Sequence, residues 1–198
     1  MIRKVIFEGP KVNYKEVLRY ARAKDSYDEY ASLLDECIRE AGDLLSYRIC
    51  YDRYEIVRSS DFIRFSAIET SSDTVKKALS GCDEMILFSA TVGSEMDRLI
   101  LRYSRTSPSK ALMLSALGTE RVESLCDAFC EQIGRELQSE QKSLRRRISP
   151  GYGDIPLSMQ KEIFALLDCE RKIGLTLGEN LLMSPSKSVT ALMGIGSK

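Results

Sequence analysis

The sequence predicts an α+β fold in which a mainly antiparallel, twisted sheet is flanked by helices. Three observations predict this class. Long segments carry apolar residues at helical spacing, whereas several shorter segments alternate between apolar and polar residues. Short polar turns separate the alternating segments, and such turns favour antiparallel pairing. The chain shows neither an internal repeat nor a low-complexity tract.

The first 45 residues are expected to be mainly helical. Residues 4–7 alternate weakly and predict a short strand before Gly9-Pro10. Asn13 is a suitable N-cap for a helix that runs through Tyr20. A second helix is expected from about Ser26 to Leu45, because apolar residues recur there at helical spacing.

The period of the pattern changes at about residue 46, and β-type composition follows. The expected strands cover 47–51, 54–57 and 62–67, with polar turns at 52–53 and 59–61. Ser72 or Asp73 then caps a short helix that stops at Gly81. The apolar run 85–92 predicts a buried strand, and Gly93 ends it.

Helices dominate the remainder of the chain. One is expected over 94–103, and Ser107-Pro108 begins a longer one, because Pro is favoured at the first helical position. This region is expected to reach about Ser143, with a break at Gly118. Its apolar stripe is typical of core packing. The last expected elements are a helix over 157–168, turns over 174–178 and a closing strand over 188–193.

Length and composition indicate one globular domain. The chain has 198 residues, of which 43% are hydrophobic, which is enough for one sizeable core. We therefore expect a single domain over 1–198, with a helical N-terminal part over 1–45 and an α+β core over 46–198.

The charge balance argues against binding to nucleic acids or to membrane surfaces. Lys plus Arg number 29 and Asp plus Glu also number 29, so any partner must be recognised locally. No apolar run is long enough to span a bilayer, and the N-terminus lacks the apolar core of a signal peptide. A cytoplasmic location is expected.

The sequence contains no histidine. This absence excludes Ser-His and Cys-His nucleophilic catalysis, and histidine-ligated metals. The six cysteines form no CxxC pair, and most fall on apolar segments where a thiol packs as a small hydrophobic group. We therefore expect no metal site and no catalytic residue, so that a bound organic molecule would supply any reactive group.

The segment 147–156, Arg-Ile-Ser-Pro-Gly-Tyr-Gly-Asp-Ile-Pro, is the most informative stretch of the chain. Its two prolines prevent regular helix and sheet pairing, while its two glycines permit unusual backbone angles. Helical patterns on both sides predict that the loop is held between two helices. A loop held in this way is a common place for binding residues.

The same residues resemble the activation domain of cobalamin-dependent methionine synthase. The motif that carries the resemblance is an Arg, three residues, Gly-Tyr and a later Pro, followed by a helix, here Arg147 to Pro156 and the helix with Leu166-Leu167. Segments 87–93, 128–129, 173–177 and 185–189 resemble flanking parts of the family. The resemblance covers about half of the chain, roughly 85–193.

This resemblance implies a site for S-adenosylmethionine. Arg147 matches the arginine that pairs with the ligand carboxylate, and a guanidinium fork suits a carboxylate. Ser149 falls where the backbone contacts the ligand, and Gly151 and Tyr152 match the motif Gly-Tyr. Asp127 aligns with an acidic site residue that favours the ligand's ammonium or sulfonium charge. Its helical angle lies off the apolar stripe, so we expect it to be exposed.

The resemblance also implies a function. A domain of this kind reactivates a corrinoid: reduction by one electron and the methyl group of S-adenosylmethionine convert inactive cob(II)alamin to methylcobalamin. Cobalamin would be supplied by a corrinoid-binding methionine synthase chain, and a flavodoxin-like or other donor would supply the electron. The chain would then be a reactivation subunit of a split methionine synthase. Fused family members continue past the segment that matches 188–189, so the site is expected to stay open until a partner covers it.

Two alternatives remain open. The chain could be an interaction protein that docks on a corrinoid-binding methyltransferase without binding S-adenosylmethionine. An independent methyltransferase of the doubly wound class is disfavoured, because that class needs a glycine-rich turn after an early strand and the glycines here lie elsewhere.

Overall fold

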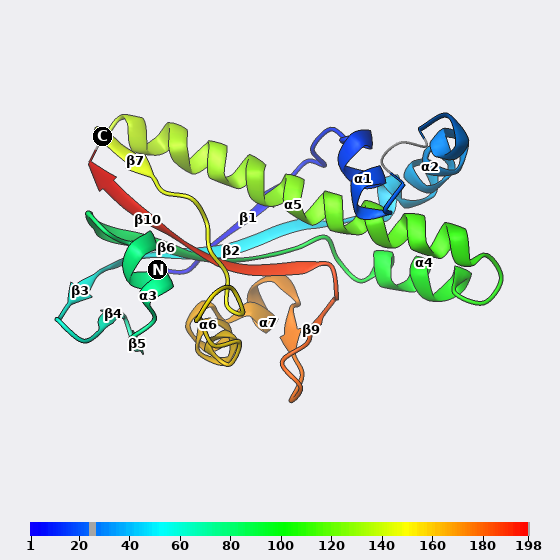
Figure 1. Ribbon diagram of the computed structural model, residues 1–198. Helices are drawn as coiled ribbons and strands as arrows, with labels where there is room; N and C mark the ends of the chain where they lie inside the picture. Colours follow the sequence, from blue (N-terminus) through cyan, green and yellow to red (C-terminus); the bar gives the residue numbers. More distant parts are fainter. Residues whose placement is uncertain (24–26, 198) are drawn as a thin grey trace.

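A computed structural model describes residues 1–23 and 27–197 and confirms the α+β class (Figure 1). Its centre is a five-stranded sheet in the order β1-β2-β6-β10-β7, in which every neighbouring pair is antiparallel. The strands of this sheet are β1 (Arg3–Phe7), β2 (Tyr47–Glu55), β6 (Cys82–Thr91), β7 (Lys142–Leu144) and β10 (Ser188–Ser197).

One face of the sheet is covered by helices, with α5 lying along it (Figure 1). The elements on this side are α1 (Tyr14–Tyr20), α2 (Tyr27–Ala41), the 3-10 helix η1 (Gly42–Leu44), α4 (Glu95–Tyr103) and α5 (Pro108–Gln138). The ring of Phe129 in α5 packs at an inclined angle against Phe88 of β6 and edge-on against Tyr51 of β2, with ring centroids 5.1 and 4.9 Å apart. Apolar burial of this kind fixes α5 to the sheet.

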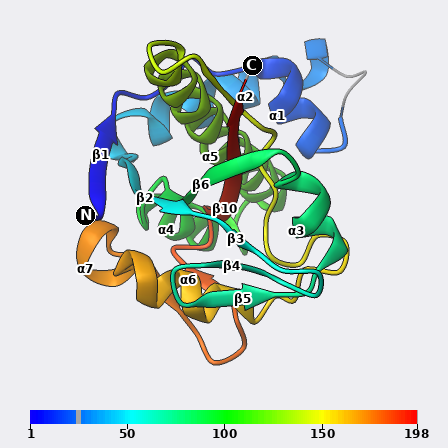
Figure 2. The same cartoon turned by 90° about the vertical axis from the view of Figure 1, so that its left-hand side faces the viewer.

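The opposite face carries smaller elements and a second core (Figure 2). They are β3 (Val57–Arg58), β4 (Ile63–Phe65), β5 (Ile68–Thr70), α3 (Asp73–Ala78), α6 (Met159–Leu167), α7 (Cys169–Ile173), β8 (Thr176–Leu177) and β9 (Met183–Ser184). Phe65, Val75 and Ile163 are fully buried there. The chain between β7 and α6, which contains the motif loop, therefore passes from the α5 side of the sheet to this one.

The central strand β6 explains the apolar run of the sequence. Ile86 and Phe88 belong to the core beneath α5, whereas Met85 and Leu87 belong to the core on the other face. Side chains of a strand alternate between its faces, so a strand covered on both sides must be apolar at every position.

Three boundary predictions are wrong. Asp52 and Arg53 form no turn but continue β2, where they pair with Leu87 and Ile86. Helix α5 does not break at Gly118, because the missing side chain makes room for Met96: a Cβ there would lie 2.7 Å from the Met96 Cγ. The helix also ends at Gln138 instead of about residue 143, since the following residues form β7 on the edge of the sheet.

Most other elements agree with the sequence patterns. Asn13 caps α1 by accepting a hydrogen bond from the Glu16 backbone, and Ser72 caps α3 in the same way through the Val75 backbone. The predicted strand over 62–67 is β4 followed by a tight turn, in which Ser66 adopts a φ of 50°. The predicted helix start at Ser26 lies outside the described residues.

Candidate functional site

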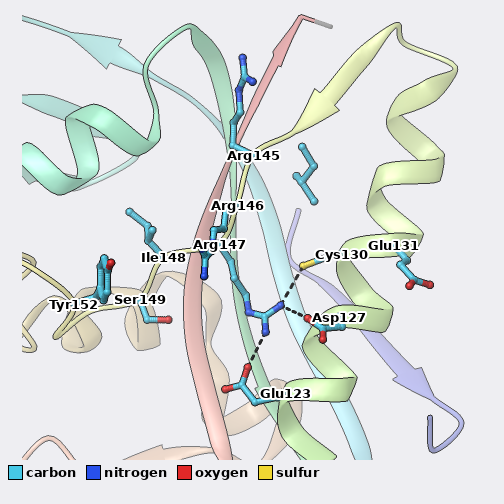
Figure 3. Close-up of a pocket in the computed structure, with 11 residues that line it drawn as sticks. Glu123, Asp127, Cys130, Glu131, Arg145, Arg146, Arg147, Ile148, Ser149 and Tyr152 are labelled. Carbon is cyan, nitrogen blue, oxygen red and sulfur yellow. Dashed lines mark hydrogen bonds and ion pairs between the residues drawn. The ribbon is translucent and has the colours of Figure 1, made fainter. Parts of the chain in front are cut away.

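A groove of about 860 Å³ opens at the edge of the sheet, between α5 and the chain that follows β7 (Figure 3). Acidic and basic side chains face each other across it. The lining residues are Glu123, Asp127, Cys130, Glu131, Leu144, Arg145, Arg146, Arg147, Ile148, Ser149 and Tyr152.

Arg147 crosses the groove and is held by two carboxylates of α5 (Figure 3). Its Nη2 donates to Glu123 Oε2 at 2.7 Å, and its Nη1 donates to Asp127 Oδ1. Nη1 also lies 3.9 Å from the Cys130 sulfur. The guanidinium thus donates to each carboxylate through one nitrogen only. It does not form the bidentate pair, two nitrogens to the two oxygens of one carboxylate, that its planar geometry allows.

The helical repeat of α5 builds the acidic wall. Glu123 and Asp127 are four residues apart, so they lie on one face of the helix, one turn apart. Their side chains are 38% and 66% exposed, and the Arg147 side chain is 25% exposed. The ion cluster is therefore open to solvent on its acidic side, where its partners can be exchanged.

The electrostatics of the groove follow from these contacts. Burial disfavours the charge of Arg147, but the hydrogen bonds that it donates to Asp127 and Glu123 outweigh this effect and raise the pKa of the guanidinium. Burial raises the pKa of the Cys130 thiol, which the neighbouring arginine only partly opposes. Cys130 is therefore a neutral thiol at neutral pH.

Two further arginines line the groove. Arg145 and Arg146 directly follow β7, and within the described part of the chain their side chains form no ion pair (Figure 3). The strand β7 directly precedes them, so they do not lie at the end of a helix. Their cationic groups remain available to an anionic group in or beside the groove.

Backbone contacts fix the beginning of the motif loop. Ile148 exchanges two backbone hydrogen bonds with Leu192 of β10, at 3.0 and 2.9 Å. Gly151 then adopts a φ of 86°, which favours glycine, and donates to the Ile155 carbonyl at 2.9 Å. Tyr152 is 65% exposed at the tip of this turn. The loop is thus bracketed by β7 and α6, not by two helices.

The structure brings four of the five predicted binding residues to one groove. Arg147, Ser149, Tyr152 and Asp127 line it, and Asp127 is exposed as expected. Gly151 does not line the groove but shapes the turn that presents Tyr152. The contact between the Arg147 and Asp127 side chains joins two residues that the sequence identified separately.

Sequence reasoning missed Glu123 and Cys130. The spacing of Glu123, Asp127 and Cys130 at i, i+4 and i+7 was a usable signal, since these positions share a helix face. The separation from Arg147 along the chain gave no hint that the arginine reaches this face.

Neither a metal cluster nor a membrane span is found among the described residues. No group of three or more His, Cys, Asp or Glu side chains there has an arrangement that could hold a metal ion. Within the same residues, every helix is too short or too polar to cross a bilayer. The six cysteines are free thiols, and only Cys130 is more than marginally exposed.

Fold and site together define an α+β domain that presents an Arg-Gly-Tyr loop and a charged groove at the edge of an antiparallel sheet. The chain belongs to the family described as "Vitamin B12 dependent methionine synthase, activation domain", whose model matches residues 63–197. This match includes the loop, the helix α5 and the strands β6 and β10. It also confirms the resemblance from which the site residues were predicted.

A solved structure supports the same fold. The chain is similar to the protein in "Crystal Structure of the MetH Reactivation Domain bound to AdoHcy", with a TM-score of 0.70 at 16% sequence identity. The match covers 98% of this chain and 78% of that one. Among curated proteins, no sequence matches this chain.

Proposed function

We propose that this chain binds S-adenosylmethionine in the groove and acts as a reactivation subunit of a split cobalamin-dependent methionine synthase. The observation that carries the proposal is the position of Arg147. The motif arginine of an activation-domain family points into an open groove and faces two carboxylates.

The amino-acid end of S-adenosylmethionine is a zwitterion, and the Arg147 cluster has the complementary charges. A ligand carboxylate would replace at least one of the two acidic partners of the guanidinium and form a two-atom pair with it. The carboxylate that is released, Asp127 or Glu123, would then accept the ligand ammonium. Binding exchanges one set of ion pairs for another, so it leaves no buried charge unpaired.

The size of the groove suits a ligand of this class. Small-molecule sites commonly measure about 300–1,000 Å³, and this groove measures about 860 Å³. Its remaining lining is mixed: Leu144 and Ile148 are apolar, and Tyr152 offers an aromatic face. These side chains would contact the part of the ligand beyond its charged end.

The corrinoid would come from a partner chain. When bound there, cobalamin supplies the cobalt centre that accepts the methyl group after one-electron reduction by a flavodoxin-like or other donor. The task of this chain is to bind and orient the sulfonium methyl donor, for which it needs no acid or base of its own.

One observation favours the alternative of an interaction protein that does not bind S-adenosylmethionine. Arg147 is already paired with two carboxylates, so a ligand must compete with both. If this competition fails, the same surface would serve only to dock on a corrinoid-binding methyltransferase.

Calorimetry separates the two functions. The chain is titrated with S-adenosylmethionine, alone and with a corrinoid-binding methionine synthase chain that lacks its own activation domain. The proposal expects saturable binding in at least one of these titrations, and methylcobalamin formation when a one-electron donor is added. Absence of binding in both titrations, together with complex formation between the two chains, would establish the interaction protein instead.

A further inference from the structure

Asp154 connects the motif loop to α3, the short helix on the face of the sheet opposite α5. Its Oδ1 accepts the Ser72 hydroxyl at 2.6 Å and the Thr74 backbone N–H at 3.1 Å, and its Oδ2 accepts the Asp73 backbone N–H at 2.7 Å. Asp73 and Thr74 are the first residues of α3. The carboxylate from the loop therefore satisfies backbone donors that a helix end otherwise leaves unpaired.

The helix and the loop are fitted to each other at this contact. Ser72 is the N-cap of α3: its hydroxyl accepts from the Val75 backbone and donates to Asp154. Gly153 has a φ of 60°, and a Cβ there would lie 2.5 Å from the Thr74 Oγ1. A side chain at position 153 would therefore clash with Thr74 unless the loop or the Thr74 side chain shifted.

This contact is the second of two anchors of the loop. The first is the backbone bridge between Ile148 and Leu192. Between the anchors, residues 149–153 are held mainly by short turns of their own, and Tyr152 is largely exposed. The position of this span thus depends on how firmly both ends are held.

We propose that Asp154 is a positioning residue: by closing the N-terminus of α3, its carboxylate fixes the far end of the motif loop and holds Ser149 and Tyr152 beside Arg147. The inference rests on the proposed function in that it treats the loop as part of a ligand site. Whether Asp154 anchors the loop can be measured without any ligand.

The first measurement is amide hydrogen exchange by NMR on the full chain without ligand. Asp154→Ala is expected to accelerate exchange at Asp73 and Thr74, and also at Gly151 and Tyr152, whose amides donate within the loop. Faster exchange at the α3 amides alone, with the loop amides unchanged, would overturn the proposal. Asp154→Asn keeps one acceptor oxygen and should lie between the wild type and Asp154→Ala.

Two control variants separate positioning from general destabilisation. Asp73→Asn removes a neighbouring carboxylate of the same helix but keeps the backbone donor, so loop exchange should not change. Asn13→Ala removes the N-cap of α1, beneath the other face of the sheet, and lowers stability without touching the loop. Gly153→Ala should reproduce the loop effect of Asp154→Ala through steric contact with Thr74.

The second measurement is the affinity for S-adenosylmethionine. Asp154→Ala should weaken binding roughly fivefold, the size of effect expected from loss of a helix cap, and neither control variant should do so. An unchanged affinity in Asp154→Ala would overturn the positioning role. If the wild type binds no S-adenosylmethionine, the proposed function fails, and the exchange experiment still decides whether Asp154 anchors the loop.

Discussion

Two arginines of this protein are each held by two carboxylates, yet their surroundings differ. Arg53 of β2 contacts Glu84 through Nε and Nη2 at 2.7 and 2.6 Å, and Glu140 through Nη1 and Nη2 at 3.0 and 2.8 Å. Both pairs use two nitrogens and two oxygens. Arg147 instead makes one contact to each of its acidic partners.

The charge balance also differs. Lys142 joins the Arg53 cluster by contacting Glu84 at 2.5 Å, so that two cations meet two carboxylates. The Arg147 cluster has one cation for two carboxylates. The cavity beside Arg53 measures about 120 Å³, against about 860 Å³ for the groove. A charge-balanced cluster beside a small cavity stabilises the fold, whereas an unbalanced one at a large groove is suited to exchanging partners with a ligand.

The largest expected effect is on ligand binding. Arg147→Ala should weaken the binding of S-adenosylmethionine by about 1.5 to 3 kcal/mol, the range for a hydrogen bond to a charged group. Arg53→Met, the matched control, should leave the affinity unchanged. Isothermal calorimetry on both variants measures the difference. Equal losses of affinity would show that the two clusters do not differ in function.

For the stability of the fold, we expect the larger effect from Arg53 and the smaller one from Arg147. Arg53→Met should lower the free energy of unfolding by about 1 kcal/mol, since partly exposed ion pairs contribute modestly even in a network. Arg147→Met should change it less, because each of its contacts uses a single nitrogen and because Asp127 is more exposed than either acidic partner of Arg53. Urea denaturation at neutral pH measures both. A larger loss of unfolding free energy in Arg147→Met than in Arg53→Met would contradict the proposed difference between the two clusters.

A smaller effect is expected from the acidic wall. Asp127→Asn should weaken the binding of S-adenosylmethionine roughly threefold, because it removes the charge of one ammonium acceptor while Glu123 remains. Binding of a carboxylate analogue that lacks the amino group should not weaken. Competition calorimetry with both ligands tests this. Equal weakening for both ligands would mean that Asp127 acts only by holding Arg147.

The local patterns of the sequence predicted most elements of the fold, and the reasons for the failures are physical. A polar pair such as Asp52-Arg53 usually marks a turn. Here it stays in a strand because Arg53 finds its carboxylate partners on β6 and after α5. Gly118 usually weakens a helix, but here it admits Met96. Both outcomes depend on residues far away in the chain.

The candidate site was predicted only in part, because some of its contacts also join residues that are far apart in the chain. The motif identified Arg147, Ser149 and Tyr152, because their spacing is local. The pairing of Arg147 with Glu123, and of Asp154 with α3, joins segments that are 24 and about 80 residues apart. No periodicity within one segment contains that information.

The smallest expected effect concerns pH and tests the Arg53 cluster alone. The hydrogen bonds from Arg53 lower the pKa of Glu84 and lower that of Glu140 to about 2. Both carboxylates have a folded-state pKa below the unfolded value of about 4.3. Their contribution to stability is therefore complete only above about pH 5.5 and is lost as the pH falls towards 2.

Because Arg53→Met lacks this contribution, the difference in unfolding free energy between wild type and variant should narrow between pH 6 and pH 3. The Asp154 anchor, whose pKa is also lowered, chiefly by the Ser72 hydroxyl, is present in both proteins and cancels. Denaturation curves at the two pH values measure the change. A constant difference would mean that Arg53 acts through its packing, and the charge pairing that distinguishes this cluster from the Arg147 groove would then contribute nothing to stability.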